Sequence, residues 1–303
     1  MQAAVIGNFD GFHLGHRRLF ELAREAAPGG RVSAVTFEPL PAAVLSPGRA
    51  PIRLTNSAER AELLRASGLV DEVVELTPDA TLLGRGPEEF VDWLRERVPF
   101  AVLVEGPDFR FGKGRAGSVE TLRELGRSRG FRVVEATPVR VRLGDGREVE
   151  VRSSTVRTLV AGGEVADAAR VLGRPYELRC LTARGDQRGR TIGWPTANLD
   201  ACGRLLPADG VYAGRAVLPD GREPIAAISV GTKPTFGESA RTCEATVLAP
   251  DGSALALPLD WYGWELRLRF HARVRGMVRF ESLDALLAAM EGDRAAVLRA
   301  MGG

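Results

Sequence analysis

The chain has 303 residues, enough for two domains that each bury a core of their own. Its 45% hydrophobic and 26% charged content is typical of a globular protein in water, and no apolar run has the length of a membrane span. A net charge of +2 gives no reason to expect nucleic acid as a partner, and three cysteines without CxxC spacing argue against a disulfide framework or a zinc site. A first strand without a basic start or long apolar stretch predicts no secretory signal, hence a cytoplasmic protein with no membrane partner.

The first part of the chain alternates between strand-like and helical segments. Apolar runs predict strands at residues 3–6, 31–37, 70–76, 101–105 and 131–136. Helix starts are marked by Asn56 with Glu59 three residues later, by Pro87 and by Ser118. Strands that alternate with helices predict an α/β, Rossmann-like domain with a parallel sheet over residues 1–172, which binds ligands at the carboxyl ends of its strands.

The pattern changes after a short helical segment, residues 164–172, that Gly173 closes. Strand-like runs then follow one another without helices between them, at residues 176–183, 210–218, 224–230, 243–248 and 265–274. They predict an antiparallel β-barrel over residues 173–303, with a final helix at residues 282–300.

The densest motif is GNFDGFHLGH, residues 7–16, directly behind the first strand. A strand that feeds a glycine-containing turn and then a helix presents backbone N–H groups and a positive dipole end to an anion. His13 and His16 are spaced i, i+3, so both imidazoles can face one side of that turn. A lone histidine there would more often be a packing residue, but the order of strand, turn, HxGH and helix favours a nucleotide site. The expected nucleotide-binding residues are Gly7, Asn8, Phe9, Asp10 and Gly15, with His13 and His16 as catalytic residues.

A second motif, GDQRGRTIGWPTAN, covers residues 185–198. Its glycines permit a tight loop that approaches phosphates closely. Thr196 and Asn198 are two apart in an extended segment, so their oxygens point to one side and could hold Mg²⁺ between nucleotide phosphates. Taken alone, the loop would more often be a polar β-turn with an arginine-rich surface. The expected nucleotide contacts are Gly185, Gly189, Arg190, Gly193, Thr196 and Asn198, the last two also as metal ligands.

Both motifs resemble those of a known family. Residues 7–16 are similar to the GxFDGxHxGH signature of the nucleotidyltransferase superfamily, and PTAN with the downstream GTKPTF stretch resembles the riboflavin kinase domain. From Ala3 to about Arg294 the chain resembles the bacterial bifunctional FAD synthetases. The resemblance implies that one ATP phosphorylates the ribityl 5′ hydroxyl of riboflavin to give FMN. A second ATP then adenylates FMN to FAD and releases pyrophosphate, with Mg²⁺ as cofactor.

The resemblance also implies roles for single residues. Glu244 matches the general base of the kinase, although a lone glutamate on a strand would more often be solvated. His13 and His16 match the pair that stabilises charge on the α phosphate.

Two further elements match the nucleotidyltransferase half. Asp108, Phe109 and Phe111 match a flavin-binding element. A later element of two hydroxyl residues and an arginine matches a binding site for ATP phosphates, although it could also be an N-cap with a surface arginine. Its residues are Ser153, Ser154 and Arg157.

Some positions depart from the family pattern. The element that usually reads TFDPHP has Glu38 and Leu40 in place of its aspartate and histidine, which could alter flavin binding. Arg152 stands where a small hydroxyl residue is more frequent. Alternatives therefore stay open: a paralogue with one active half or one that acts on a modified flavin, and a module that binds flavin or nucleotide without catalysis. The expected partners are the small molecules riboflavin, FMN and ATP, bound by a monomer or a transient oligomer.

Overall fold

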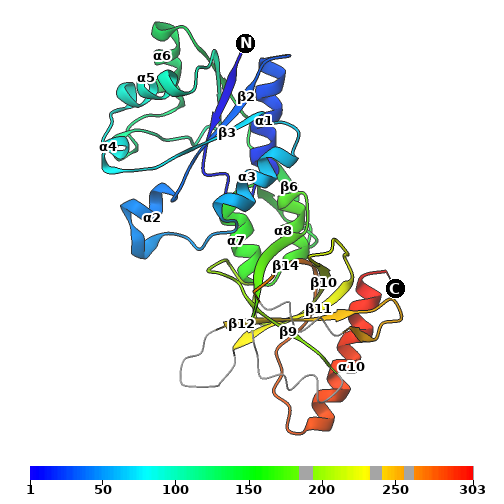
Figure 1. Cartoon of the computed structure of the whole chain (residues 1–303). Helices are drawn as coiled ribbons and strands as arrows, with labels where there is room; N and C mark the ends of the chain where they lie inside the picture. The colour runs from blue at the N-terminus through cyan, green and yellow to red at the C-terminus, as the bar shows by residue number, and fades with distance from the viewer. Residues whose placement is uncertain (184–193, 233–240, 256–262, 303) are drawn as a thin grey trace. The chain divides into compact units, whose positions relative to one another are not determined.

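The computed structural model describes residues 1–183, 194–232, 241–255 and 263–302 (Figure 1). The chain forms two compact units. The first comprises Met1–Val141 with Glu148–Ser153, and the second comprises Arg142–Arg147 with Ser154–Gly303.

The first unit is built on a five-stranded sheet in the order β3-β2-β1-β4-β5. All four pairings are parallel, which confirms the predicted Rossmann-like domain. Its strands are β1 (Ala3–Ile6), β2 (Val32–Phe37), β3 (Glu72–Leu76), β4 (Val102–Glu105) and β5 (Arg132–Glu135). Continuous apolar runs form these strands because both faces of a parallel sheet are buried.

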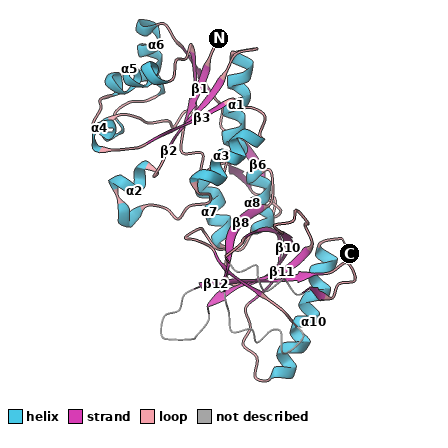
Figure 2. Cartoon of the chain, in the orientation of Figure 1, coloured by secondary structure: helices cyan, strands magenta, loops and turns pink. Residues whose placement is uncertain are grey.

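Helices cover both faces of this sheet (Figure 2). On one face lie α1 (Leu14–Ala26) and α3 (Ser57–Ala66). On the other lie α4 (Ala80–Leu83), α5 (Pro87–Arg97) and α6 (Val119–Arg129). The predicted capping box is present, because the Asn56 side chain accepts from the Glu59 N–H while the Glu59 carboxylate accepts from the Asn56 N–H.

Short elements complete the connections of the first unit. Helix α2 (Pro41–Leu45) and a 3₁₀ turn, η1 (Pro47–Arg49), follow β2, and a second turn, η2 (Lys113–Arg115), follows β4. Strands β6 (Arg140–Arg142) and β7 (Glu148–Glu150) pair with each other. The sequence did not predict this pair, because charged residues flank a single valine in each strand.

The second unit contains an antiparallel barrel in which β11-β10-β14-β8-β9-β12 close through a pairing of β11 with β12. The predicted barrel is therefore confirmed. Inward side chains such as Leu178, Tyr212, Ile228 and Phe270 are fully buried and fill its interior. The strands are β8 (Tyr176–Ala183), β9 (Ala197–Asp200), β10 (Gly210–Val217), β11 (Ile225–Thr232), β12 (Arg241–Leu248) and β14 (Glu265–Gly276), with β13 (Ala254–Leu255) attached to β12.

Among the described residues, three helices belong to the second unit in whole or in large part: α7 (Ser153–Ala161), α8 (Val165–Leu172) and α10 (Leu283–Ala300). Gly173 ends α8 in the left-handed conformation, as predicted. The predicted C-terminal helix is present as α10, where Val297 is buried against the barrel but Leu283 is 55% exposed. No helix among the described residues is long and apolar enough to cross a membrane.

Candidate active sites

The two histidines of the first motif lie against each other at the start of α1. Their rings stack with centroids 3.6 Å apart and planes 15° from parallel. His13 is the N-cap of α1, and its Nδ1 accepts the backbone N–H of His16 at 3.2 Å. The edge of the Phe9 ring meets the His16 ring at 5.3 Å between centroids. Both imidazoles therefore lie at the positive end of the α1 dipole, next to the carboxyl end of β1.

Buried aromatic rings hold the loop between β1 and α1 in an unusual backbone conformation. Phe9 and Phe12 have φ of 47° and 34°, in the left-handed region that side chains other than glycine seldom adopt. Both rings are buried in the core beneath α1. A Cβ on Gly7 would lie 2.8 Å from the Phe9 ring, and one on Gly15 would lie 3.0 Å from the Val151 carbonyl oxygen. The glycines of the motif thus allow close packing behind the loop.

Asp10 is at the centre of a buried hydrogen-bond network. Its carboxylate accepts the N–H groups of Leu54 and Thr55 and the Thr55 hydroxyl, at distances from 2.9 to 3.2 Å. The Thr55 hydroxyl also accepts from the Gly11 N–H, and the Ser153 hydroxyl donates to the Asp10 carbonyl at 2.8 Å. With 2% of its surface exposed, Asp10 ties the loop to two distant segments. Asn8, in contrast, is exposed.

Glu38, one of the departures from the family pattern, is part of an ionic cluster at the carboxyl ends of β1, β2 and β3. Arg53 donates to both oxygens of its carboxylate, at 2.7 and 2.6 Å. Arg60, whose side chain is 1% exposed, donates to Glu38, to Glu75 and to the carbonyl of Asn8. Hydrogen bonding to Arg53 holds the pKa of the Glu38 carboxyl below its ordinary value, with a smaller contribution from Arg60. The carboxylate of Glu38 is therefore held by arginines of this chain.

The predicted flavin-binding residues follow β4. Phe109 and Phe111 stack with centroids 5.6 Å apart, and Phe111 is buried in the core on the α5 side of the sheet. Phe109 is only partly buried, and Asp108 is exposed. Arg152, the second departure, forms an ion pair with Asp108 and another with Glu150.

The predicted phosphate-binding trio lies at the start of α7. Ser153 begins the helix and is tied to Asp10, as described above. Ser154 is exposed, and Arg157 is half-buried one turn further along. Ser154 and Arg157 belong to the second unit.

The barrel brings the other predicted residues together on its outer face. Asn198 on β9 lies directly opposite Glu244 on β12, and Glu244 lies opposite Ser229 on β11. The neighbours of Glu244, Cys243 and Ala245, are each 1% exposed because they point into the barrel, so Glu244 points outward. The pattern of alternation places Thr196, just before β9, on the same side as Asn198.

Four predicted nucleotide contacts lie outside the described residues: Gly185, Gly189, Arg190 and Gly193. Within the described part of the chain, no group of three or more His, Cys, Asp or Glu side chains is arranged to hold a metal ion. The magnesium ligands expected from the sequence are the hydroxyl of Thr196 and the amide oxygen of Asn198, which belong to none of these four residue types.

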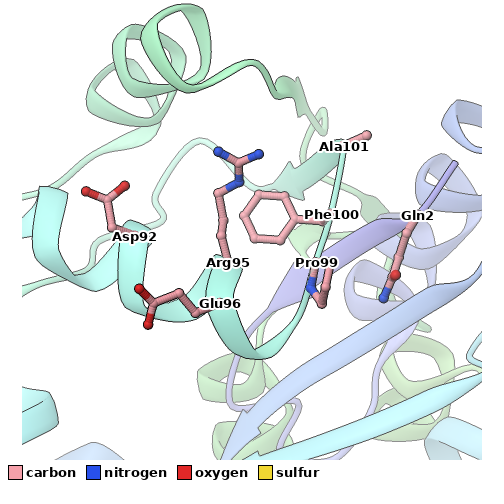
Figure 3. A pocket seen from close by; sticks show the side chains of 7 residues that line it. All are labelled: Gln2, Asp92, Arg95, Glu96, Pro99, Phe100 and Ala101. Carbon is pink, nitrogen blue, oxygen red and sulfur yellow. The ribbon is translucent and has the colours of Figure 1, made fainter.

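A pocket of about 500 Å³ in the first unit has none of the predicted site residues in its lining (Figure 3). It is lined by Gln2, which precedes β1, and by Ala101, which precedes β4, together with Arg95 and Phe100. It therefore opens at the amino ends of the central strands, whereas parallel sheets of this kind bind ligands at the carboxyl ends. Arg95 donates to the Arg129 carbonyl, so this side chain has a structural role.

Three residues that lie in or near these sites carried no motif in the sequence. Arg60 is part of a helix and carried no motif. Ser229 became notable only through its register with Glu244. Glu105 ends an otherwise apolar strand, VLVE, and a fully buried carboxyl in that position is a signal that the sequence did contain.

The fold and the two sites define a two-part enzyme that joins a nucleotidyltransferase domain to a kinase barrel. A family model of FAD synthetase matches residues 1–149, and a model of riboflavin kinase matches residues 172–301. The chain belongs to the family of bifunctional riboflavin kinase/FMN adenylyltransferases.

Similar proteins span nearly the whole chain. Proteins named bifunctional riboflavin kinase/FMN adenylyltransferase are 33% identical in Escherichia coli K12, covering 95% of this chain and 89% of that protein, and 34% identical in Pseudomonas fluorescens, covering 97% and 91%. A crystal structure described as a macrolide-efflux protein from Streptococcus pneumoniae matches 98% of this chain and 93% of that one. It has a TM-score of 0.81 and 28% identity, so the same arrangement of elements occurs there.

Proposed function

We propose that this protein makes both flavin cofactors, phosphorylating riboflavin to FMN and adenylating FMN to FAD with one ATP at each step. The proposed division assigns adenylyl transfer to residues 1–172 and phosphorylation to residues 173–303. The observation that carries this proposal is that both sets of reactive side chains occur in one chain: the stacked His13–His16 pair at a helix start and the Asn198–Glu244 pair on the barrel.

In the adenylyl-transfer half, the residues act by position and charge. The phosphate of FMN attacks the α phosphorus of ATP, a new P–O bond forms, and the bond to pyrophosphate breaks. His13 and His16, at the amino end of α1, stabilise the negative charge that develops on the α phosphate. Asn8 and the backbone N–H groups of the loop bind phosphate oxygens, with Ser153, Ser154 and Arg157 as further ATP contacts. Phe109 supplies an aromatic surface for the flavin beside Phe111.

Asp10 has a positioning role in this scheme. Its carboxylate already binds three donors of segment 54–55, so it holds the loop rather than the nucleotide. The ion pair of Asp108 with Arg152 places one acidic and one basic group at the edge of the flavin-binding element.

In the kinase half, Glu244 accepts the proton of the ribityl 5′ hydroxyl as its oxygen attacks the γ phosphorus of a second ATP. Thr196 and Asn198 would hold Mg²⁺, since a hydroxyl and an amide oxygen beside a carboxylate form a donor set of hard oxygens that suits this ion. When bound, the ion supplies neutralisation of phosphate charge. We expect a cytoplasmic protein, monomeric or transiently oligomeric, that acts on small molecules rather than on nucleic acid or membranes.

The test is incubation of the protein with riboflavin, ATP and Mg²⁺, followed by separation of flavins over time. FMN should appear first and FAD later. FMN without FAD would identify an enzyme with one active half, and flavin binding without any product would identify a binding module. Chelation of divalent cations should stop FMN formation. Asn198→Ala should raise the Mg²⁺ concentration needed for half-maximal FMN formation, whereas the same change at exposed Asp220 should not.

A further inference from the structure

Glu105 lies where the two central strands of the sheet separate. The parallel register of β1 and β4 ends at Ala4 and Leu103. Beyond it, the backbone N–H of Ile6 donates to Oε1 of Glu105 at 2.8 Å. A side-chain carboxyl thus takes the place of the next backbone acceptor in the ladder.

This hydrogen bond joins the starts of two predicted substrate loops. Ile6 is the last residue of β1, and Gly7 opens the loop that carries the histidine pair. Glu105 is the last residue of β4, and Gly106 opens the segment that carries Asp108 and Phe109. The distance between the two loops at their base is therefore set by the Glu105 side chain.

The location is the topological switch point of the sheet. In the order β3-β2-β1-β4-β5, the chain leaves β1 towards β2 on one side and β4 towards β5 on the other. Helix α1 then covers one face and α6 the opposite face. The crevice that this divergence opens is where such sheets bind their ligands.

The surroundings of Glu105 favour a neutral acid. The residue is 1% exposed and shares a sheet face with Leu103. Burial raises the pKa of its carboxyl well above the ordinary value, and the Ile6 N–H opposes this only in part. Among the described residues, the Ile6 N–H is the group that forms a hydrogen bond with the carboxyl. A protonated carboxyl can accept this bond without placing negative charge beneath a loop that binds phosphates.

We propose that Glu105 is a positioning residue for adenylyl transfer, whose carboxyl oxygen fixes the spacing between the His13–His16 loop and the flavin-binding segment. The inference rests on the proposed function, because its effect is on the FMN-to-FAD reaction. It assigns no contact with substrate to Glu105.

The test compares three variants with the wild-type full-length protein. Glu105→Gln keeps an acceptor oxygen at the same reach and removes ionisation. Glu105→Leu removes the acceptor, and Glu105→Asp shortens the reach by one methylene. The matched control is Glu135→Leu, because Glu135 pairs with Glu105 in the register of β5 and β4 but is exposed.

The expected result is a loss of FMN adenylylation without a loss of riboflavin phosphorylation. Glu105→Leu and Glu105→Asp should lower kcat for FMN adenylylation about 10- to 100-fold, because small displacements of reacting groups cost rates of this order. Glu105→Gln should restore most of the activity, and Glu135→Leu should resemble the wild type. Riboflavin phosphorylation, measured in the same samples, should be unchanged in all variants. Because the kinase barrel belongs to the other unit, thermal unfolding of each variant is needed to show that the first unit is folded.

Several outcomes would overturn the inference. One is wild-type adenylylation in both Glu105→Leu and Glu105→Asp. Another is a loss in Glu105→Gln as large as in Glu105→Leu, which would mean that an acid rather than an acceptor is required. If Glu105→Leu does not fold, the adenylylation rates of Glu105→Asp and Glu105→Gln are compared instead. Equal rates in these two variants would overturn the inference. A wild-type protein that makes no FAD from FMN would remove the proposed function, and this inference with it.

Discussion

Asn198 and Glu244 face each other across β9 and β12, at directly opposite positions of an antiparallel pair. Side chains at such positions stand about 5 Å apart at their Cβ atoms. An amide oxygen and a carboxylate are thereby held side by side on the outside of a closed barrel, which is the arrangement that the proposed kinase site needs.

This relationship predicts a separation of the two activities. Glu244→Gln should lower FMN formation about 10²- to 10⁴-fold, because the amide cannot accept the hydroxyl proton. Conversion of supplied FMN to FAD should continue at the wild-type rate. The matched control is Glu265→Gln, the same substitution at an exposed glutamate on β14. Loss of both activities in a folded Glu244→Gln protein would contradict the assignment of one site to each half.

The histidine pair predicts a loss of FAD formation without a loss of FMN formation, and at His13 also a loss of stability. His16→Ala should abolish FAD formation and leave FMN formation intact. His13→Ala should do the same and also destabilise the protein by about 0.5–2 kcal/mol, because it removes the N-cap acceptor of α1. His13→Asn should recover that stability but not the activity, since asparagine is a good N-cap. Thermal unfolding together with a flavin assay measures both, and full activity in His13→Asn would exclude a catalytic imidazole at this position.

The Asp10 network predicts that the loss of a single hydroxyl lowers the free energy of unfolding. Thr55→Val keeps the shape of the side chain but removes its bonds to the Asp10 carboxylate and the Gly11 N–H. Buried groups left without partners should lower the free energy of unfolding by about 1–3 kcal/mol. Thr55→Ser keeps the hydroxyl and should stay closer to the wild type. Urea unfolding of the three proteins is the measurement, and equal stability of the valine and serine variants would argue against the network.

Glu105 predicts a particular dependence of stability on pH. Its pKa is raised in the folded state, so its contribution is complete below the ordinary value of about 4.5 and is lost as the pH rises towards the folded value. Relative to Glu105→Gln, the wild type should therefore lose free energy of unfolding with increasing pH across that window. Above the folded pKa the difference should be constant. If the free energies of unfolding of the wild type and of Glu105→Gln change in parallel from pH 4 upward, the pKa of the Glu105 carboxyl is not raised in the folded state.

The sequence identified the main elements because their signals are local. The apolar run of β1 and the alternation of β8 gave the observed limits, Ala3–Ile6 and Tyr176–Ala183. The start of α3 followed from Asn56 and Glu59, which cap the helix within one turn. Patterns of this length involve only neighbours in the chain, so they can be recognised without knowledge of tertiary contacts.

Features that depend on distant contacts were not predictable in this way. Asp10 was expected among the nucleotide-binding residues, and only the fold shows its carboxylate against a segment 44 residues further along. The arginines that hold Glu38 come from segments beyond α2, which no motif connects to that position. The assignment of the individual site residues to ATP and flavin stays a prediction until the variants above are measured.

The barrel joins its earliest strand to its latest one, with Tyr176 of β8 beside Phe270 of β14. Closure must therefore wait until synthesis has passed residue 276, whereas every segment of the first unit has been made by residue 153. Domains fold in order as the ribosome releases them, and pairings between distant segments form slowly. A nascent chain can thus complete its first unit while the barrel is still open, and premature termination before β14 should remove the barrel but leave the first unit.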